Sequence, residues 1–173
     1  MNDYLHLLRG PRYAWWRPLL AFLLIPGFLL LVVLVLVGVI AAAGASRSAI
    51  ESLDGEMHPA TFALTNLLLA SLIPAALLAT RIAHGVKAGF VSSVAGRLRW
   101  RWLVRCMAVT APVYIVYVGL DLLLDWPQSP RPAQWMVLLL LVCVGTPLQA
   151  AGEEFIARGL ILQNIGAWFR NPR

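Results

Sequence analysis

The sequence predicts an all-α protein: a polytopic transmembrane helical bundle of about four spans, with an interfacial helix and a C-terminal helix that carries a charged motif. Hydrophobic residues make up 60% of the 173 residues and charged residues only 13%, and the mean hydropathy is +0.77. Soluble domains are about 45–50% apolar and about 25% charged. Four stretches also reach the roughly 20 apolar residues that a helix needs to cross a bilayer. We treat residues 1–173 as one membrane domain.

The four predicted spans cover residues 19–43, 60–80, 106–126 and 133–152, and the motif helix continues to about residue 169. The first stretch has 25 residues without a charge, so it can cross with some tilt. A cleaved signal peptide is the alternative, because Ala41-Ala42-Ala43 resembles a cleavage site. Signal peptides, however, have a shorter hydrophobic region of about 7–15 residues. We therefore interpret this stretch as a retained span.

Basic residues gather in three segments that fall on one side of the membrane when the spans alternate. They are Arg9, Arg12, Arg17, Arg81, Lys87, Arg97, Arg99, Arg101, Arg105, Arg170 and Arg173. Because cytoplasmic loops are enriched in arginine and lysine, this pattern predicts a multi-pass protein of the plasma (inner) membrane with both termini in the cytoplasm. Tryptophans support this arrangement, since amphipathic rings settle at the headgroup level. Trp15, Trp16, Trp100, Trp102 and Trp168 lie near predicted inner boundaries, and Trp126 and Trp135 near outer ones.

The loop at residues 96–105 alternates arginine with tryptophan and leucine, a composition that can also indicate nucleic-acid binding. On a helix, Arg97, Arg101 and Arg105 align at intervals of four residues beside Leu98 and Trp102. That pattern favours a helix in the membrane interface, with its arginines toward anionic headgroups. We expect the lipid bilayer as a partner and no nucleic acid.

Two pairs of potential metal ligands have simpler interpretations. Cys106 and Cys143 lie in apolar runs without ligand spacing, which favours small buried hydrophobic side chains over a disulfide or a metal site. Asp121 and Asp125 lie four residues apart near the end of the third span. We expect them among the headgroups at the outer interface; a cation-binding role is the alternative.

The C-terminal motif helix has two candidate beginnings. Thr146 followed by Pro147 and Gln149 matches a capping box, with proline at the first helical position. Alternatively, Pro147 only kinks the fourth span. In both cases residues 150–168 are predicted to be helical, since they are rich in alanine, leucine, isoleucine and glutamine and lack proline.

This helix carries Glu153, Glu154 and Arg158 in an otherwise apolar stretch. Each charge costs about 3 kcal/mol on insertion scales, so such residues mark a functional site or a buried ion pair. Glu154 and Arg158 are four residues apart, which predicts a buried ion pair that fixes the helix. Glu153 lies about 140° around the helix from Arg158 and is expected to face elsewhere. Its predicted stripe consists of Ala157, Leu160 and Asn164.

The two glutamates are therefore expected to play different parts. Glu153 has no local cation and needs water, a histidine or a metal from another segment, which suits a general base near neutral pH. Gly152 and Gly159 would let another helix or a substrate backbone approach closely. The alternative is purely structural: all three charged residues hold helices together.

The motif Glu-Glu-x-x-x-Arg at 153–158, preceded by Thr-Pro-Leu-Gln-Ala-Ala-Gly and followed by Gly159, resembles the first motif of the CPBP family of intramembrane proteases. This group is related to CAAX prenyl endopeptidases and bacterial Abi proteins. Family members typically have phenylalanine where Ala157 stands. The resemblance implies that Glu153 activates the water that attacks the scissile amide, with Glu154 and Arg158 as its supporting pair. These three are the candidate catalytic residues.

The family pattern continues with Phe-x-x-x-His and His-x-x-x-Asn or His-x-x-x-Asp, and this sequence contains neither motif. Its histidines, His6, His58 and His84, precede the motif and lie outside the predicted spans, so we interpret each as a solvent or interface residue. A divalent metal such as zinc in full-length members would find no ligands here, and the cofactor stays undetermined. We expect an incomplete core that does not hydrolyse peptides alone. A truncated reading frame is favoured over a binding remnant or half of a split protein.

The leading functional hypothesis is an intramembrane endopeptidase of the CPBP or CAAX-protease type that acts on a membrane-associated peptide or protein. The alternative is a non-catalytic membrane scaffold, or a bacteriocin-immunity-type protein that binds a partner through the same site. A transporter fragment is less favoured, because no inverted repeat or pair of broken helices is evident.

Overall fold

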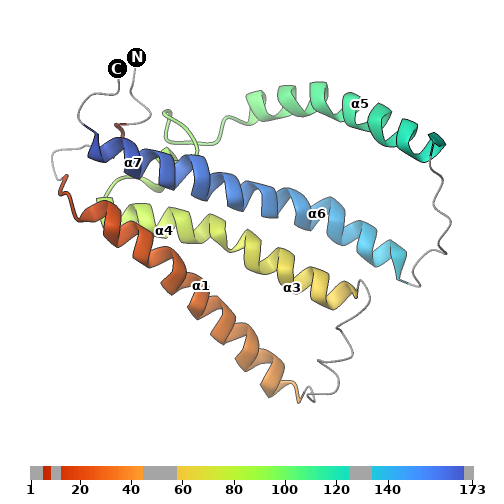
Figure 1. Cartoon of the computed structure of the whole chain (residues 1–173), viewed down its shortest axis with the longest axis horizontal. Helices are drawn as coiled ribbons and strands as arrows, with labels where there is room; N and C mark the ends of the chain where they lie inside the picture. Colours follow the sequence, from red (N-terminus) through yellow and green to blue (C-terminus); the bar gives the residue numbers. More distant parts are fainter. Residues whose placement is uncertain (1–5, 9–12, 45–57, 125–133, 170–173) are drawn as a thin grey trace.

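The computed structural model describes residues 6–8, 13–44, 58–124 and 134–169 (Figure 1). Across these ranges the chain forms helices and no strand, which confirms the all-α prediction. The elements are α1 (Arg17–Ala42), α3 (Pro59–Ala70), α4 (Leu72–His84), η1 (Ala88–Val91), α5 (Trp100–Leu124), α6 (Trp135–Glu154), η2 (Phe155–Ile161) and α7 (Leu162–Trp168).

Four helical stretches are long and apolar enough to cross a membrane: Arg17–Ala42, Pro59–His84, Trp100–Leu124 and Trp135–Trp168. They match the four predicted spans in order, and the chain is a membrane protein. The first and second stretches begin within two residues of prediction, and the second continues to His84. The outer end of the third predicted span, with Asp125 and Trp126, lies outside the described residues.

The second span consists of two helices that meet at Ser71. Pro74 lies in the first turn of α4 and has no backbone N–H, so the helical ladder is interrupted one turn before it. The Ser71 hydroxyl donates a hydrogen bond to the Leu68 carbonyl at 2.6 Å, which satisfies one backbone group near the break.

The predicted capping box at Thr146 is wrong, and Pro147 lies inside α6. Helices α6, η2 and α7 follow one another without a gap over 34 residues. A membrane helix tolerates proline because neighbouring groups satisfy the freed carbonyl. The Gln149 side chain, assigned to the cap, instead donates a hydrogen bond to Glu153.

The predicted interfacial helix is also not a separate element. Helix α5 begins at Trp100, so Arg101 and Arg105 belong to its first turns while Arg97 precedes it in irregular backbone. No glycine or proline interrupts the chain between Trp100 and Cys106, and the spanning helix therefore extends through this basic segment.

Three glycines spaced seven residues apart bring the long C-terminal helix against its neighbours. A Cβ atom at Gly145 would lie 2.9 Å from Cγ of Asn66 on α3, and one at Gly152 would collide with the Leu69 carbonyl oxygen. At Gly159 a Cβ atom would collide with Val91 of η1. We call these three residues the glycine seam. The close approach expected at Gly152 and Gly159 is therefore present.

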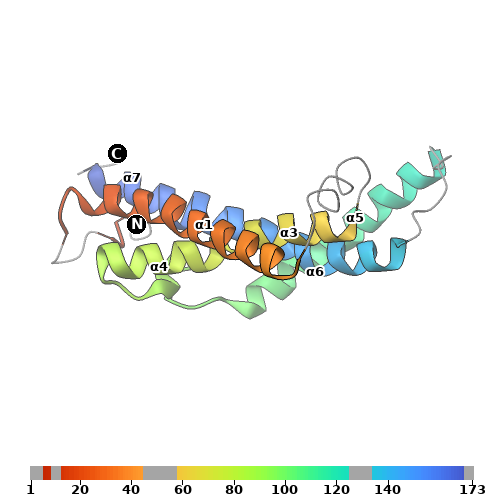
Figure 2. The same ribbon diagram turned by 90° about the horizontal axis from the view of Figure 1, so that it is seen from below.

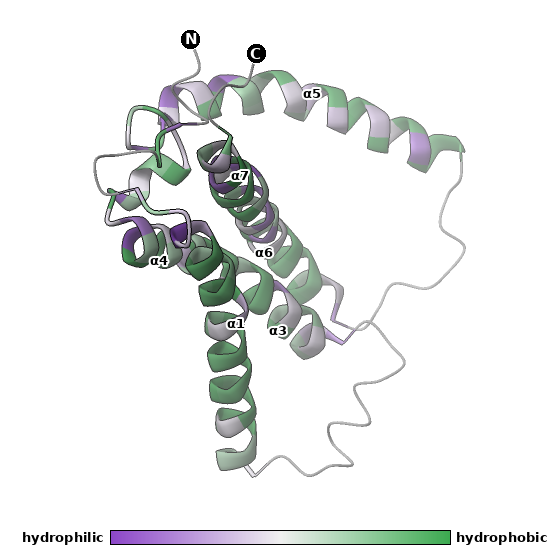
Figure 3. Cartoon of the chain, turned by 60° about the vertical axis from the view of Figure 1, so that its left-hand side comes forward, coloured by the Kyte–Doolittle hydropathy of each residue, from purple (hydrophilic) through white to green (hydrophobic). Residues whose placement is uncertain are grey.

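Helices α1, α3, α4 and α6–α7 form the packed part of the molecule: α1 lies on α4, and α3 lies on α6. The hydrophobic core gathers where α1, α4 and η2 meet, around Ala21, Ala76, Ala79, Val91 and Leu160. Helix α5 stands apart from this bundle in Figures 1 and 3, and no residue of it is buried. Figure 2 shows that α1, α4 and α7 come together at one end of the molecule.

The six described tryptophans lie at helix ends, as the aromatic-belt pattern predicts. Trp15 and Trp16 precede α1, Trp100 and Trp102 lie in the first turn of α5, Trp135 begins α6, and Trp168 ends α7. The Trp168 indole Nε1 donates to the Trp15 carbonyl at 3.0 Å, which joins the end of α7 to the start of α1.

We predict that Gly152→Ala destabilises the protein by about 1–3 kcal/mol, because the added methyl group meets the backbone of α3 rather than a flexible side chain. The matched control is Gly38→Ala on α1, where nothing lies within 4 Å of the new methyl group. The control should be neutral or stabilising, since alanine is the better helix former. Both variants would be compared with the unmodified chain by their unfolding free energies in mixed detergent. Equal changes in the two variants would contradict a close contact between Gly152 and α3.

Candidate functional site

The charged motif lies at the junction between α6 and η2. Glu153 and Glu154 are the last two residues of α6, and Arg158 follows in η2. Arg158 Nε lies 2.7 Å from Glu154 Oε1, which confirms the predicted pair of residues four apart. The pair is not buried, however: the Arg158 side chain is 76% exposed and that of Glu154 is 52% exposed.

The exposure of this pair follows from the glycine seam. Gly152 and Gly159 turn one face of α6 and η2 onto α3 and η1, so Glu154 and Arg158 point away from the packed neighbours. In a membrane-spanning segment, a charged pair on an outer face needs lipid headgroups, water or a partner to cover it.

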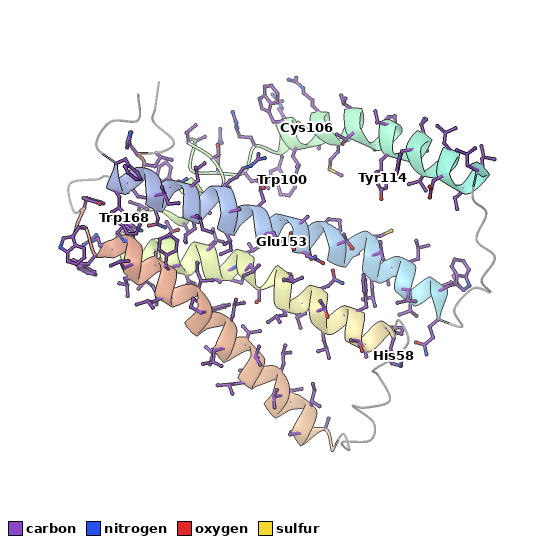
Figure 4. All side chains as sticks on the ribbon, in the orientation of Figure 1. His58, Trp100, Cys106, Tyr114, Glu153 and Trp168 are labelled. Atoms are coloured by element: carbon purple, nitrogen blue, oxygen red, sulfur yellow. The ribbon has the colours of Figure 1, made fainter. Side chains whose placement is uncertain are left out.

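Glu153 has a different surrounding from Glu154. Its Oε1 accepts a hydrogen bond from Gln149 Nε2 at 3.1 Å, one turn back on the same helix, and the residue is exposed (Figure 4). The described residues therefore do not enclose Glu153. Among the described residues its hydrogen-bond partner is a neutral amide, rather than a cation or histidine from another segment.

The stripe predicted for Glu153 is divided by η2, which is a π-helix. A π-helix has more residues per turn than an α-helix, so the phase of every later residue shifts. Leu160 and Asn164 are fully buried, whereas Glu153 and Ala157 are exposed. Glu153 therefore does not share a face with Asn164.

The interpretation of His84 as a solvent or interface residue is wrong. His84 is the last residue of α4 and is only 4% exposed. Its Nε2 lies 2.7 Å from Oδ1 of Asn164 on α7. The Asn164 amide Nδ2 donates to the Leu160 carbonyl at 2.8 Å, which leaves Oδ1 as the acceptor. The His84 Nε2 therefore carries the proton in this pair.

Further polar groups surround the His84–Asn164 pair. Gln163 Nε2 donates to the Phe90 carbonyl at 2.9 Å, and Arg17 Nη1 donates to the His84 carbonyl at 3.2 Å. Three buried atoms here find no partner among the described residues: Nδ1 of His84, Oε1 of Gln163 and Nε of Arg17. We call Arg17, His84, Gln163 and Asn164 the polar junction; it connects α1, α4, η1 and α7.

One signal in the sequence pointed to part of this arrangement. Gly85 has φ of +67° and its N–H bonds to the Arg81 carbonyl, the usual way for glycine to end a helix. Glycine is the residue that most often ends a helix, so a second span predicted to end at Gly85 rather than at Thr80 includes His84. Its partner, 80 residues later, carries no such signal.

The other candidate ligands are dispersed over the described residues. His58 begins α3, where its Nδ1 accepts a hydrogen bond from Ala60 N at 3.2 Å, and His6 is half-buried. Cys106 and Cys143 are free and exposed on α5 and α6, so the prediction that they are buried is wrong. Their faces are turned away from neighbouring helices. Asp121 is exposed on α5, and Asp125 lies outside the described ranges.

No group of three histidine, cysteine, aspartate or glutamate side chains comes together among the described residues. Comparison with protein-family models, curated proteins and solved structures found no match to this chain.

We predict that His84→Ala lowers the unfolding free energy by about 1–3 kcal/mol, because the buried Asn164 oxygen loses its donor. Asn164→Ala should cost a similar amount. The double variant should cost less than the sum of the two, by about 0.5–1.5 kcal/mol, as expected of residues in direct contact. Additive effects in the detergent unfolding assay would contradict a direct His84–Asn164 interaction.

Proposed function

We propose that this chain supplies the glutamate-bearing part of an intramembrane endopeptidase of the CPBP or CAAX-protease type. Its substrate is a membrane-associated peptide or protein. The observation that carries the proposal is the difference between adjacent carboxylates. Among the described residues, Glu154 pairs with Arg158 at 2.7 Å, whereas Glu153 hydrogen bonds to the neutral amide of Gln149 and is the carboxylate left without a cation.

In the proposed reaction, Glu153 removes a proton from a water molecule, and the resulting hydroxide attacks the carbonyl carbon of the scissile amide. Glu153 then returns the proton to the departing amine as the C–N bond breaks. Glu154 and Arg158 fix the helix on which this base stands. We assign to Phe-x-x-x-His and His-x-x-x-Asn motifs on a further segment the remaining groups that the reaction needs.

The backbone at the motif supports a functional assignment. The π-helical segment η2 begins directly after Glu154, and π-helical turns inside α-helices occur frequently at functional sites. The segment is also held from outside, since Asn164 bonds to its Leu160 carbonyl and Val91 packs on its Gly159.

We place the protein in the plasma (inner) membrane with its termini in the cytoplasm. The basic residues Arg17, Arg81 and Arg101 lie at the start of α1, the end of α4 and the start of α5. These are helix ends that face the same side when spans alternate, and basic ends of this kind are typical of the cytoplasmic side.

Exposure of the motif favours a second candidate function, that of a non-catalytic scaffold or immunity-type protein. With Arg158 76% and Glu154 52% exposed, the charged face is open to a partner helix or peptide. In this case Glu153 binds a polar group of the partner and no bond is broken.

Co-expression of the full chain with a segment carrying Phe-x-x-x-His and His-x-x-x-Asn tests the first function. We expect cleavage of a membrane peptide pool, detected by mass spectrometry of new termini. Glu153→Gln should lower the rate by about 10²–10⁴-fold, because it removes the general base. The matched control is Asp121→Asn, an exposed carboxylate on α5, which should cleave at the parental rate. Cleavage by Glu153→Gln at that rate would refute the assignment; partner binding without cleavage would favour the scaffold.

For the ion pair, we predict that Arg158→Ala lowers the folded yield in membranes more than Glu153→Gln does. Removing the guanidinium leaves the Glu154 carboxylate without its counter-charge in a spanning helix, a change of about 3 kcal/mol on insertion scales. The double variant Glu154→Ala/Arg158→Ala should recover most of the yield, because neither member of the pair is then left without its counter-charge. Equal yields of the single and double variants, measured by fluorescence-detected size exclusion, would contradict the pairing.

A further inference from the structure

A dense group of arginines surrounds the start of α5. Arg97 and Arg99 lie in the irregular segment before the helix, and Arg101 and Arg105 lie in its first turns. All four are exposed, and the first turn of α5 contains no acidic residue. We call Arg97, Arg99, Arg101 and Arg105 the arginine collar.

The collar has no counter-charge in the described part of the chain. The ion pair found there joins Glu154 to Arg158, far from the collar in the sequence. No collar side chain hydrogen bonds to or forms an ion pair with another described residue. Four neighbouring positive charges repel one another, and an anion among them would lower that repulsion.

The surface has shallow, open depressions at this position. A cavity of about 560 Å³ is lined by Arg97, Leu98, Arg99, Trp100, Arg101 and Trp102. A second cavity of about 390 Å³ adjoins it at Trp100 and Arg101 and continues to Val104 and Arg105. Guanidinium groups bind phosphate oxygens in bidentate geometry, and tryptophan settles at the headgroup level of a bilayer.

An apolar groove continues along the same helix. A third cavity of about 650 Å³ is lined by Met107, Thr110, Ala111, Val113 and Tyr114, among others. Val104, Met107, Ala111 and Tyr114 are spaced three or four residues apart and share one face of α5. Ten helical residues, from Arg101 to Ala111, extend about 15 Å, which is half of the roughly 30 Å hydrocarbon core. The groove therefore matches the depth of one leaflet.

We propose that α5 carries a binding site for one anionic phospholipid. Its phosphate lies in the collar cavity, bound by Arg97, Arg99 and Arg101, and an acyl chain lies along the groove from Val104 to Tyr114. The lipid covers a face of α5 that no described helix packs against (Figure 4). The inference rests on the membrane spans and the collar geometry, and it is independent of the proposed peptidase function.

Native mass spectrometry of the full chain, purified in detergent and titrated with defined lipids, tests the site. We expect phosphatidylglycerol to bind at least tenfold more tightly than phosphatidylcholine. The affinity for phosphatidylglycerol should fall as the salt concentration rises, because salt screens exposed charges. Arg97→Gln/Arg99→Gln/Arg101→Gln should weaken phosphatidylglycerol binding by at least about tenfold, since each basic side chain near an anionic membrane contributes about fivefold. The matched control, Arg81→Gln/Lys87→Gln, removes basic residues outside the collar and should change binding less than about twofold.

A second pair of variants tests the groove without altering charge. Ala111→Trp fills the groove and should weaken phosphatidylglycerol binding. Ala108→Trp, at an alanine of α5 that does not line the groove, should not. Equal retention of the two lipids by the unmodified chain would overturn the proposal, as would equal loss in the triple variant and its control. Displacement of the lipid by glycerol 3-phosphate would also overturn it, because the site would then bind a soluble phosphate rather than a lipid.

Discussion

The close contact along the glycine seam determines how the rest of the molecule is arranged. Gly145 and Gly152 allow α6 to lie against α3 with almost no side-chain volume between them, and Gly159 does the same for η2 and η1. Lipid tails are as apolar as leucine, so helices in a membrane associate through close packing and hydrogen bonds rather than through the hydrophobic effect. The glycine seam supplies the close packing, and the polar junction supplies the hydrogen bonds.

This contact also decides which face of the motif helix is presented outward. Because the glycines face the neighbouring helices, Glu154 and Arg158 point away from the bundle, and Glu153 beside them is also exposed. The π-helical η2 then shifts the helix phase, so that Leu160 and Asn164 turn inward where an unbroken α-helix would have placed them beside Glu153. The charged motif and the buried polar junction therefore occupy successive parts of one helix but opposite environments.

Part of this arrangement follows directly from the sequence. Spans are set by apolar length, so all four appear where uncharged runs occur, and a spacing of four residues is sufficient to pair Glu154 with Arg158. The π-helical turn has no comparable signal, so the sequence pattern places Asn164 on the wrong stripe. His84 was misread for a related reason: its environment depends on a residue 80 positions away, which only the packing of α4 on η2 and α7 brings into contact.

The break at Ser71 divides the bundle into two bodies that share the motif helix. Helix α3 packs mainly on α6 on one side of the break, while α4 on the other side packs mainly on α1 and η2 and makes fewer contacts with α6. The boundary between these bodies crosses the long C-terminal helix at Glu154 and Phe155, where α6 becomes η2. A change in the angle between α3 and α4 at Ser71 would therefore act on the place where the two glutamates meet the π-helical turn.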